Sequence, residues 1–159
     1  MSNHLKPIGF IGVGLMGSCL VRRLLEKKYT VNIFDKNEKN LKDLINKKRI
    51  SLSTSPAKLS QDCEIIFICV DNTKSVGDVV FKETGVIKNA SKNTIIIDLS
   101  TTLANETINF SNKLSTEKGA SWIDAPMSGG PDKALSGSLA IMIGGEKKVV
   151  KKISPILNN

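Results

Sequence analysis

The sequence is poor in aromatic residues and in cysteine, and each shortage excludes a class of protein. Only 4% of its 159 residues are aromatic, which leaves few side chains for stacking on the bases of single-stranded nucleic acid. The three cysteines, Cys19, Cys63 and Cys69, are odd in number and form no C-x-x-C pair. They therefore indicate neither a disulfide framework nor a structural zinc site, and we expect a reducing compartment and no bound metal.

Long apolar runs are also absent. The longest, Ile65–Val70, has the length of a strand and falls far short of the roughly 20 residues that cross a bilayer as a helix. The first six residues are polar and contain no apolar core of a secretory signal. We expect a cytoplasmic protein with no membrane partner.

Positive charge is in excess, because 23 Lys and Arg residues against 15 Asp and Glu residues give a net charge of +8. Three interpretations are open: solvated helix faces, attraction for a phosphorylated ligand, and nucleic-acid binding. The scarcity of aromatic residues favours the first, and we expect no nucleic-acid partner.

Short apolar runs alternate with stretches of helical periodicity along the whole chain. We expect strands at 8–11, 31–34, 50–52, 64–70, 94–99, 121–124 and 138–143, and helices at 16–27, 37–48, from 56, at 72–81, at 105–118 and from 146. Strands joined through helices predict parallel pairing, and central strands without polar alternation predict cover on both sides. The expected fold is α/β: a Rossmann-like, doubly wound, mainly parallel sheet with helices on both faces.

A glycine pattern follows the first expected strand and opens the first expected helix. It reads Gly12-Val13-Gly14-Leu15-Met16-Gly17, which is G-x-G-x-x-G. Gly12 permits the tight turn, Gly14 lets a diphosphate approach the backbone, and Gly17 allows the helix to pack closely on the strand. The hexapeptide alone also fits a tight turn in an unrelated fold. In its strand–turn–helix context it predicts that residues 1–159 form one dinucleotide-binding domain.

Asp35 ends the second expected strand, where an acidic side chain accepts hydrogen bonds from the hydroxyls of the adenosine ribose. A carboxylate there repels a 2′-phosphate, which favours NAD over NADP. Lys36 follows at once and could offset that repulsion, so NADP stays possible. A solvated residue at the end of a strand is the alternative for Asp35.

Four segments of the chain resemble motifs of the β-hydroxyacid dehydrogenases, a family that includes 3-hydroxyisobutyrate dehydrogenase and 6-phosphogluconate dehydrogenase. Ile8–Gly17 is similar to the opening of that family, and Ile97–Thr101, Asp124–Gly130 and Leu139–Gly145 are similar to later motifs in the same order. The resemblance covers essentially the whole chain. It implies an NAD(P)-dependent oxidoreductase that transfers a hydride between nicotinamide and a small β-hydroxyacid or semialdehyde.

The resemblance also implies roles for residues beyond the glycine turn. It places Thr101 near the cofactor and Val70 and Asp71 along the adenosine. The alternative for Val70 and Asp71 is that they are ordinary residues at the end of a strand. In Ser128-Gly129-Gly130, two glycines after a serine let successive backbone N–H groups converge on an anion. The resemblance implies that this loop binds the carboxylate of the substrate, and a flexible turn before a helix is the alternative.

The chain departs from the family in ways that bear on activity. Lys28 and Lys133 stand where the family usually has glycine, and each costs on the order of 1 kcal/mol if the position needs a positive φ. The family's catalytic Lys, in a G-x-x-x-K-x-x-N-N pattern, is not found, so we expect no catalytic residue in this chain. The family's C-terminal helical domain is not found either. We expect the chain alone to be inactive and to need that domain or a full-length subunit. The alternative is a truncated, non-catalytic module that senses dinucleotide or pairs with such a subunit.

Overall fold

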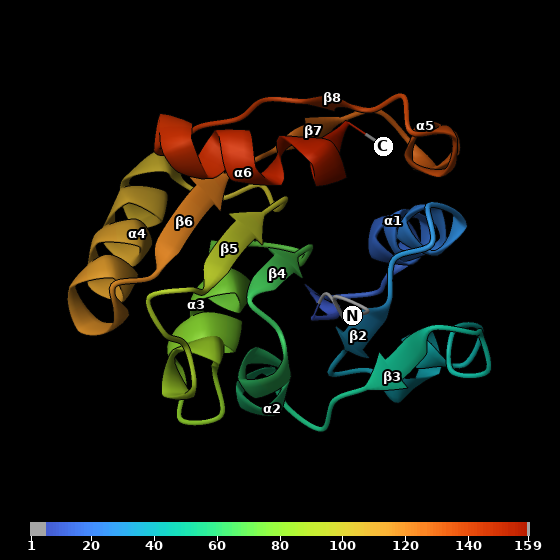
Figure 1. Cartoon of the computed structure of the whole chain (residues 1–159), viewed down its shortest axis with the longest axis horizontal. Helices are drawn as coiled ribbons and strands as arrows, with labels where there is room; N and C mark the ends of the chain where they lie inside the picture. The colour runs from blue at the N-terminus through green and yellow to red at the C-terminus, as the bar shows by residue number, and fades with distance from the viewer. Residues whose placement is uncertain (1–5, 159) are drawn as a thin grey trace, which may run out of the picture.

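The computed structural model describes residues 6–158, so most of the polar N-terminal segment lies outside the described residues. Six parallel strands form one sheet in the order β3-β2-β1-β4-β5-β6 (Figure 1). Their bounds are β1 Ile8–Ile11, β2 Val31–Phe34, β3 Ile50–Leu52, β4 Ile65–Ile68, β5 Ile95–Asp98 and β6 Ser121–Asp124. The strand order reverses between β1 and β4, the point beside which ligands of open α/β sheets bind.

Helices cover both faces of this sheet. One face carries α1 (Leu15–Glu26) and α6 (Lys147–Leu157), and the other carries α2 (Pro56–Asp62), α3 (Thr73–Phe81) and α4 (Ala104–Lys118). Because successive side chains of a strand point to opposite faces, neighbouring residues of β1 enter different cores. Phe10 packs in the core beneath α1, and Ile11 in the core beneath α2 and α3. The expected doubly wound α/β fold is confirmed.

Local signals set the ends of three helices as expected. Ser55 accepts a hydrogen bond from Lys58 N at the start of α2, and Asn72 accepts one from Ser75 N at the start of α3. Gly119 ends α4 in the left-handed conformation, at φ 64°. These caps fix where the chain leaves each helix and returns to the sheet.

The helix expected at 37–48 is wrong. The structure has only a 3₁₀ turn at Glu38–Leu41, followed by hydrogen-bonded turns. The apolar residues of this segment do not reach the core together, because Leu44 is fully buried while Ile45 is 47% exposed. The short polar side chains of Asn37 and Asn40 also bond locally, which competes with the helical hydrogen-bond pattern.

The strand expected at 138–143 is much shorter than predicted. Only Ala140–Ile141 (β8) pairs, antiparallel to Met127–Ser128 (β7), in a separate two-stranded sheet. Gly129 follows β7 directly and turns the chain into α5 (Pro131–Ser136), so no longer partner is available to β8. A single antiparallel bridge from Asp124 to Gly144 ties this segment to the end of β6. The small sheet thus lies beside the carboxyl edge of the main one.

The two lysines that stand where the family usually has glycine differ in backbone conformation. Lys28 has a φ of 68°, so the condition for a backbone cost is met there. Lys133 lies inside α5 and is not among the residues with a positive φ, so the condition is not met at that position. Arg49, just before β3, is the second non-glycine residue with a positive φ among residues 6–158, at 69°. Lys28 lies between α1 and the inner strand β2, and Arg49 lies between a turn and the edge strand β3.

Candidate functional site

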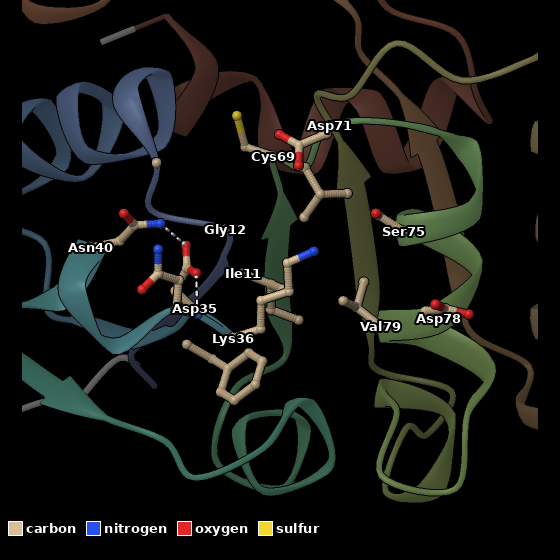
Figure 2. Close-up of a pocket in the computed structure, with 14 residues that line it drawn as sticks. Ile11, Gly12, Asp35, Lys36, Asn40, Cys69, Asp71, Ser75, Asp78 and Val79 are labelled. Carbon is tan, nitrogen blue, oxygen red and sulfur yellow. Dashed lines mark hydrogen bonds between the residues drawn. The ribbon is translucent and has the colours of Figure 1, made fainter.

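Two clefts open at the carboxyl edge of the sheet and meet over the turn between β1 and α1. The first, of about 270 Å³ and called here the Asp35 cleft, lies between the ends of β2 and β4 and helix α3 (Figure 2). The second, of about 350 Å³ and called here the Thr101 cleft, lies between the start of α1, the end of β5 and the segment 127–129. Both clefts are lined by Gly14, Cys69, Val70 and Asp71. A ligand of two parts joined by a short bridge fits this arrangement.

The three glycines of the turn differ in what a side chain would meet. A Cβ on Gly12, whose φ is +90°, would overlap the carbonyl oxygen of Cys69, and one on Gly17 would overlap the carbonyl oxygen of Gly12. A Cβ on Gly14 would have nothing within 4 Å. Gly12 and Gly17 are therefore required by the fold, whereas the space in front of Gly14 is open to a ligand. Gly14 also precedes the first residue of α1, whose N-terminus favours an anion.

The carboxylate of Asp35 connects the end of β2 to the glycine turn. Its Oδ2 accepts hydrogen bonds from Val13 N at 2.8 Å and from Asn40 Nδ2 at 3.1 Å, and its Oδ1 accepts one from Asn37 N at 2.8 Å. Sequence reasoning assigned Val13 to the phosphate turn, but its side chain is buried and its N–H points to Asp35. Val13 therefore lines neither cleft and supports the site through its hydrogen bond to Asp35.

Most of the predicted site residues lie together around these clefts. Lining the Asp35 cleft are Gly12, Gly14, Asp35, Lys36, Val70 and Asp71. Lining the Thr101 cleft are Gly14, Leu15, Met16, Gly17, Val70, Asp71, Thr101 and Gly129. Of the predicted residues, Val13, Ser128 and Gly130 line neither cleft.

Helix α3 contributes residues that sequence reasoning missed. Ser75, Asp78 and Val79 line the Asp35 cleft, and Figure 2 shows Ser75 and Val79 directed toward it. Their spacing of three and four residues places them on one helix face, a signal that could have found them once α3 was expected beside the glycine turn. Hydrogen bonds from Lys74 and Lys82 lower the pKa of Asp78, so this carboxylate is ionised at neutral pH.

A buried hydrogen-bond network holds the end of β5 beside the Thr101 cleft. Asp98 is fully buried; its Oδ1 accepts from Ser100 N at 3.0 Å and its Oδ2 from Thr102 Oγ1 at 2.9 Å. Ser100 Oγ accepts in turn from Val70 N at 3.1 Å, which joins the ends of β4 and β5. Burial raises the pKa of Asp98, and these hydrogen bonds oppose the rise. The network leaves Thr101 exposed at the cleft.

The segment Ser128-Gly129-Gly130 reaches the Thr101 cleft through its middle residue. Gly129 lines the cleft with a φ of 137°, a conformation that favours glycine. Ser128 is the exposed second residue of β7, and Gly130 is the N-cap of α5, with open space where a Cβ would stand. The chain therefore changes direction beside the cleft at Gly129.

Proton-transferring side chains are scarce in the Thr101 cleft. No lysine, histidine or tyrosine lines it in the part of the chain that the structure describes. Burial raises the pKa of the Cys69 thiol to about 12, helped by the charges of Asp98 and Asp71, so Cys69 stays protonated at neutral pH. Across residues 6–158 no three His, Cys, Asp or Glu side chains gather as a metal site would need, and no helix has the length and apolarity to span a bilayer.

A parallel sheet whose first turn leaves Gly14 open, with an acidic residue at the end of the second strand, defines a dinucleotide-binding domain of the Rossmann type. Residues 7–159 match the family described as the NAD binding domain of 6-phosphogluconate dehydrogenase. The chain belongs to this family, and NAD is the cofactor that the family binds.

Known proteins similar to the chain agree with this assignment. It is 34% identical over 151 residues to 2-(hydroxymethyl)glutarate dehydrogenase of Eubacterium barkeri, covering 95% of this chain and 50% of that protein. It is 30% identical over 149 residues to the human cytokine-like nuclear factor N-PAC, covering 94% of this chain and 27% of that protein. The chain thus spans about half or less of the length of these relatives.

Solved structures show the same fold. Psf3 in complex with NADP+ and 2-OPP superposes with a TM-score of 0.88 at 27% identity, over 95% of this chain and 53% of that one. The 3-hydroxyisobutyrate dehydrogenase of Mycobacterium tuberculosis, solved with L-serine, gives 0.87 at 22% identity, over 97% of this chain and 51% of that one. An imine reductase variant from Myxococcus stipitatus in complex with NAD+ gives 0.85 at 18% identity, over 97% of this chain and 52% of that one.

Proposed function

We propose that this chain binds NAD(H) across its two clefts, with the diphosphate over Gly14. The observation that carries the proposal is the open space before Gly14 at the point where the clefts meet. The adenosine half then lies in the Asp35 cleft, along Val70 and Asp71, and the nicotinamide half lies beside Thr101. The N–H groups at the start of α1 face the bridge and stabilise its charge.

We propose NAD(H) as the preferred cofactor over NADP(H). Asp35 is half-buried and lines the cleft, so a 2′-phosphate on the ribose would meet its charge at short range. Lys36 also lines this cleft, and Figure 2 shows its ammonium group extending into the space between Asp35 and α3. Its charge reduces the penalty against NADP(H) without removing it, since the carboxylate holds the position next to the turn.

We propose that the domain serves an oxidoreductase that acts on a small β-hydroxyacid or semialdehyde. The nicotinamide supplies hydride transfer when it is bound. The turn at Ser128–Gly130 borders the Thr101 cleft, and we assign to it the carboxylate of the substrate. The names of relatives such as 2-(hydroxymethyl)glutarate dehydrogenase support this substrate class.

We infer that the proton donor and acceptor for the reaction come from outside this chain. The Thr101 cleft offers no lysine, histidine or tyrosine among its described lining residues, and Cys69 keeps its proton at neutral pH. We assign this role to a lysine of a further helical domain or of a full-length subunit that closes the cleft. The chain alone then binds dinucleotide without turning over substrate.

Calorimetric titration with NADH and NADPH tests this function directly. We expect binding of both cofactors, with NADH bound more tightly, and no NADH-dependent reduction of succinic semialdehyde or glyoxylate by the chain alone. Absence of binding at millimolar cofactor would overturn the cofactor assignment. Robust turnover would overturn the assignment of the proton donor to another segment. The binding result and the turnover result test these two assignments separately.

A further inference from the structure

Three groups in the described part of the chain donate to Asp35, and of these only Asn40 does so from its side chain. Val13 and Asn37 donate through their backbone N–H groups, whereas Asn40 donates through Nδ2 at 3.1 Å. Asn40 is half-buried, lines the Asp35 cleft, and sits in the 3₁₀ turn Glu38–Leu41. A substitution at this position can therefore change the hydrogen bonding of Asp35 while both backbone donors remain.

The two carboxylate oxygens of Asp35 accept different numbers of hydrogen bonds. A carboxylate offers about four acceptor positions, two on each oxygen. Oδ2 accepts from both Val13 N and Asn40 Nδ2, so its two positions are filled. Among residues 6–158, Oδ1 accepts only from Asn37 N, which leaves one acceptor position on this oxygen for a ligand. Figure 2 shows Asn40 beside the carboxylate of Asp35, with a dashed line for the hydrogen bond between them.

We propose that Asn40 is a positioning residue that sets the preference for NAD(H) over NADP(H). It fixes Oδ2, and so holds Oδ1 where it accepts a ribose hydroxyl and where its charge opposes a 2′-phosphate. This inference rests on the proposed function, because it concerns the ribose end of the same site. It adds a residue whose effect on this preference is exerted through Asp35.

Loss of the Asn40 donor frees one position on Oδ2 and loosens the carboxylate. The Lys36 ammonium, which extends into the same cleft, then competes for the freed oxygen. An ion pair with Lys36 would turn the carboxylate from the ribose and neutralise part of the charge that repels a 2′-phosphate. NADH therefore loses affinity, while NADPH loses less or none.

Calorimetry on Asn40→Ala, with NADH and NADPH in separate titrations, tests this role. We expect the Kd for NADH to rise roughly threefold to tenfold and the Kd for NADPH to change by less than about twofold. Asn40→Gln keeps an amide donor and should return the ratio of the two Kd values toward that of the unmodified chain. Asn40→Ser is too short to reach Asp35 and gives the same comparison if Asn40→Ala does not fold.

The ratio of the two Kd values separates positioning from a structural role. A variant that merely destabilised the 3₁₀ turn would lower the thermal midpoint and weaken both cofactors alike. Asn112→Ala, an exposed residue on α4 away from both clefts, is the matched control and should change neither Kd. An unchanged ratio in Asn40→Ala overturns this inference while the proposed function stands. Failure of the unmodified chain to bind either cofactor overturns the proposed function itself.

Discussion

The backbone N–H of Val13 donates a 2.8 Å hydrogen bond to Oδ2 of Asp35, which joins the glycine turn to the end of β2 across 22 positions of sequence. Val13 is 1% exposed, so its N–H has no ready access to water as a substitute partner. The residue that we assign to the ribose thus also holds the turn that we assign to the diphosphate. One carboxylate therefore couples the proposed ribose position to the proposed diphosphate position.

This coupling changes what Asp35→Ala should do. We expect weaker binding of both NADH and NADPH, with the larger loss for NADH, because the variant removes the ribose acceptor and releases the turn. The orphaned Val13 N–H should lower the free energy of unfolding by about 1–3 kcal/mol. Calorimetry and urea unfolding measure the two effects. A loss confined to NADH, with unchanged stability, would show that the Val13 hydrogen bond contributes nothing to the turn.

The glycines of the turn provide a matched pair of substitutions. Gly12→Ala places a Cβ against the carbonyl of Cys69 at a φ of +90°, so we expect a loss of roughly 2–4 kcal/mol in the free energy of unfolding. Gly14→Ala meets no protein atom within 4 Å and should cost less than about 1 kcal/mol of stability. Because its methyl group would occupy the space of the diphosphate, it should raise the Kd for NADH roughly tenfold or more. Urea unfolding and calorimetry distinguish these results, and normal NADH binding by Gly14→Ala would contradict the site.

The buried Asp98 gives the protein a pH dependence of known sign. Burial raises the pKa of Asp98 in the folded state, so the folded protein binds this proton more tightly than the unfolded chain does. Its contribution to stability is fully present below the unfolded-state pKa of about 4, and is lost as pH rises through the folded-state pKa. We expect Asp98→Asn to remove this loss and to be at least as stable as the unmodified chain at pH 7, since an amide oxygen still accepts from Ser100 N.

Urea unfolding of Asp98→Asn and the unmodified chain between pH 4 and pH 8 checks this expectation. Glu117→Gln, an exposed change of the same charge on α4, serves as the control and should leave the pH profile unaltered. A parallel pH dependence in Asp98→Asn and the unmodified chain would show that Asp98 does not titrate as its burial requires.

Lys28 offers a simple gain in stability. It is exposed, with a φ of 68°, a region that costs an L-residue other than glycine about 1 kcal/mol or more. Lys28→Gly removes that cost but adds freedom to the unfolded chain, so we expect a net gain of roughly 0.5–1 kcal/mol by thermal or urea unfolding. Lys133→Gly is the contrasting variant, because Lys133 lies within α5 and should lose about 1 kcal/mol as glycine. Equal effects at the two positions would contradict the difference in backbone conformation.

Local sequence signals were sufficient for much of this protein. The apolar runs around Phe10 and Ile66 predict buried parallel strands, because a strand covered on both faces needs no polar alternation. The order of Gly12, Gly14 and Asp35 predicts where a dinucleotide would lie, since strand, turn and helix follow each other within a short length of chain. Helix caps such as Asn72 act within a single helical turn and could likewise be predicted from the sequence.

How residues from separate elements meet at the site depends on packing. The order of strands and helices, the glycine turn and the acidic residue after β2 can be predicted from sequence alone, because those features depend on near neighbours. The sequence alone does not predict that Asp35 bonds Val13, that Asn40 shares the same oxygen, or that Ser75 faces the cleft from α3. The helix wrongly expected at 37–48 has a different cause, because Asn37 N and Asn40 Nδ2 bond locally to Asp35, two and five positions away. Contacts between separate elements, such as Asp35 with Val13, are fixed by packing, and no local pattern encodes them.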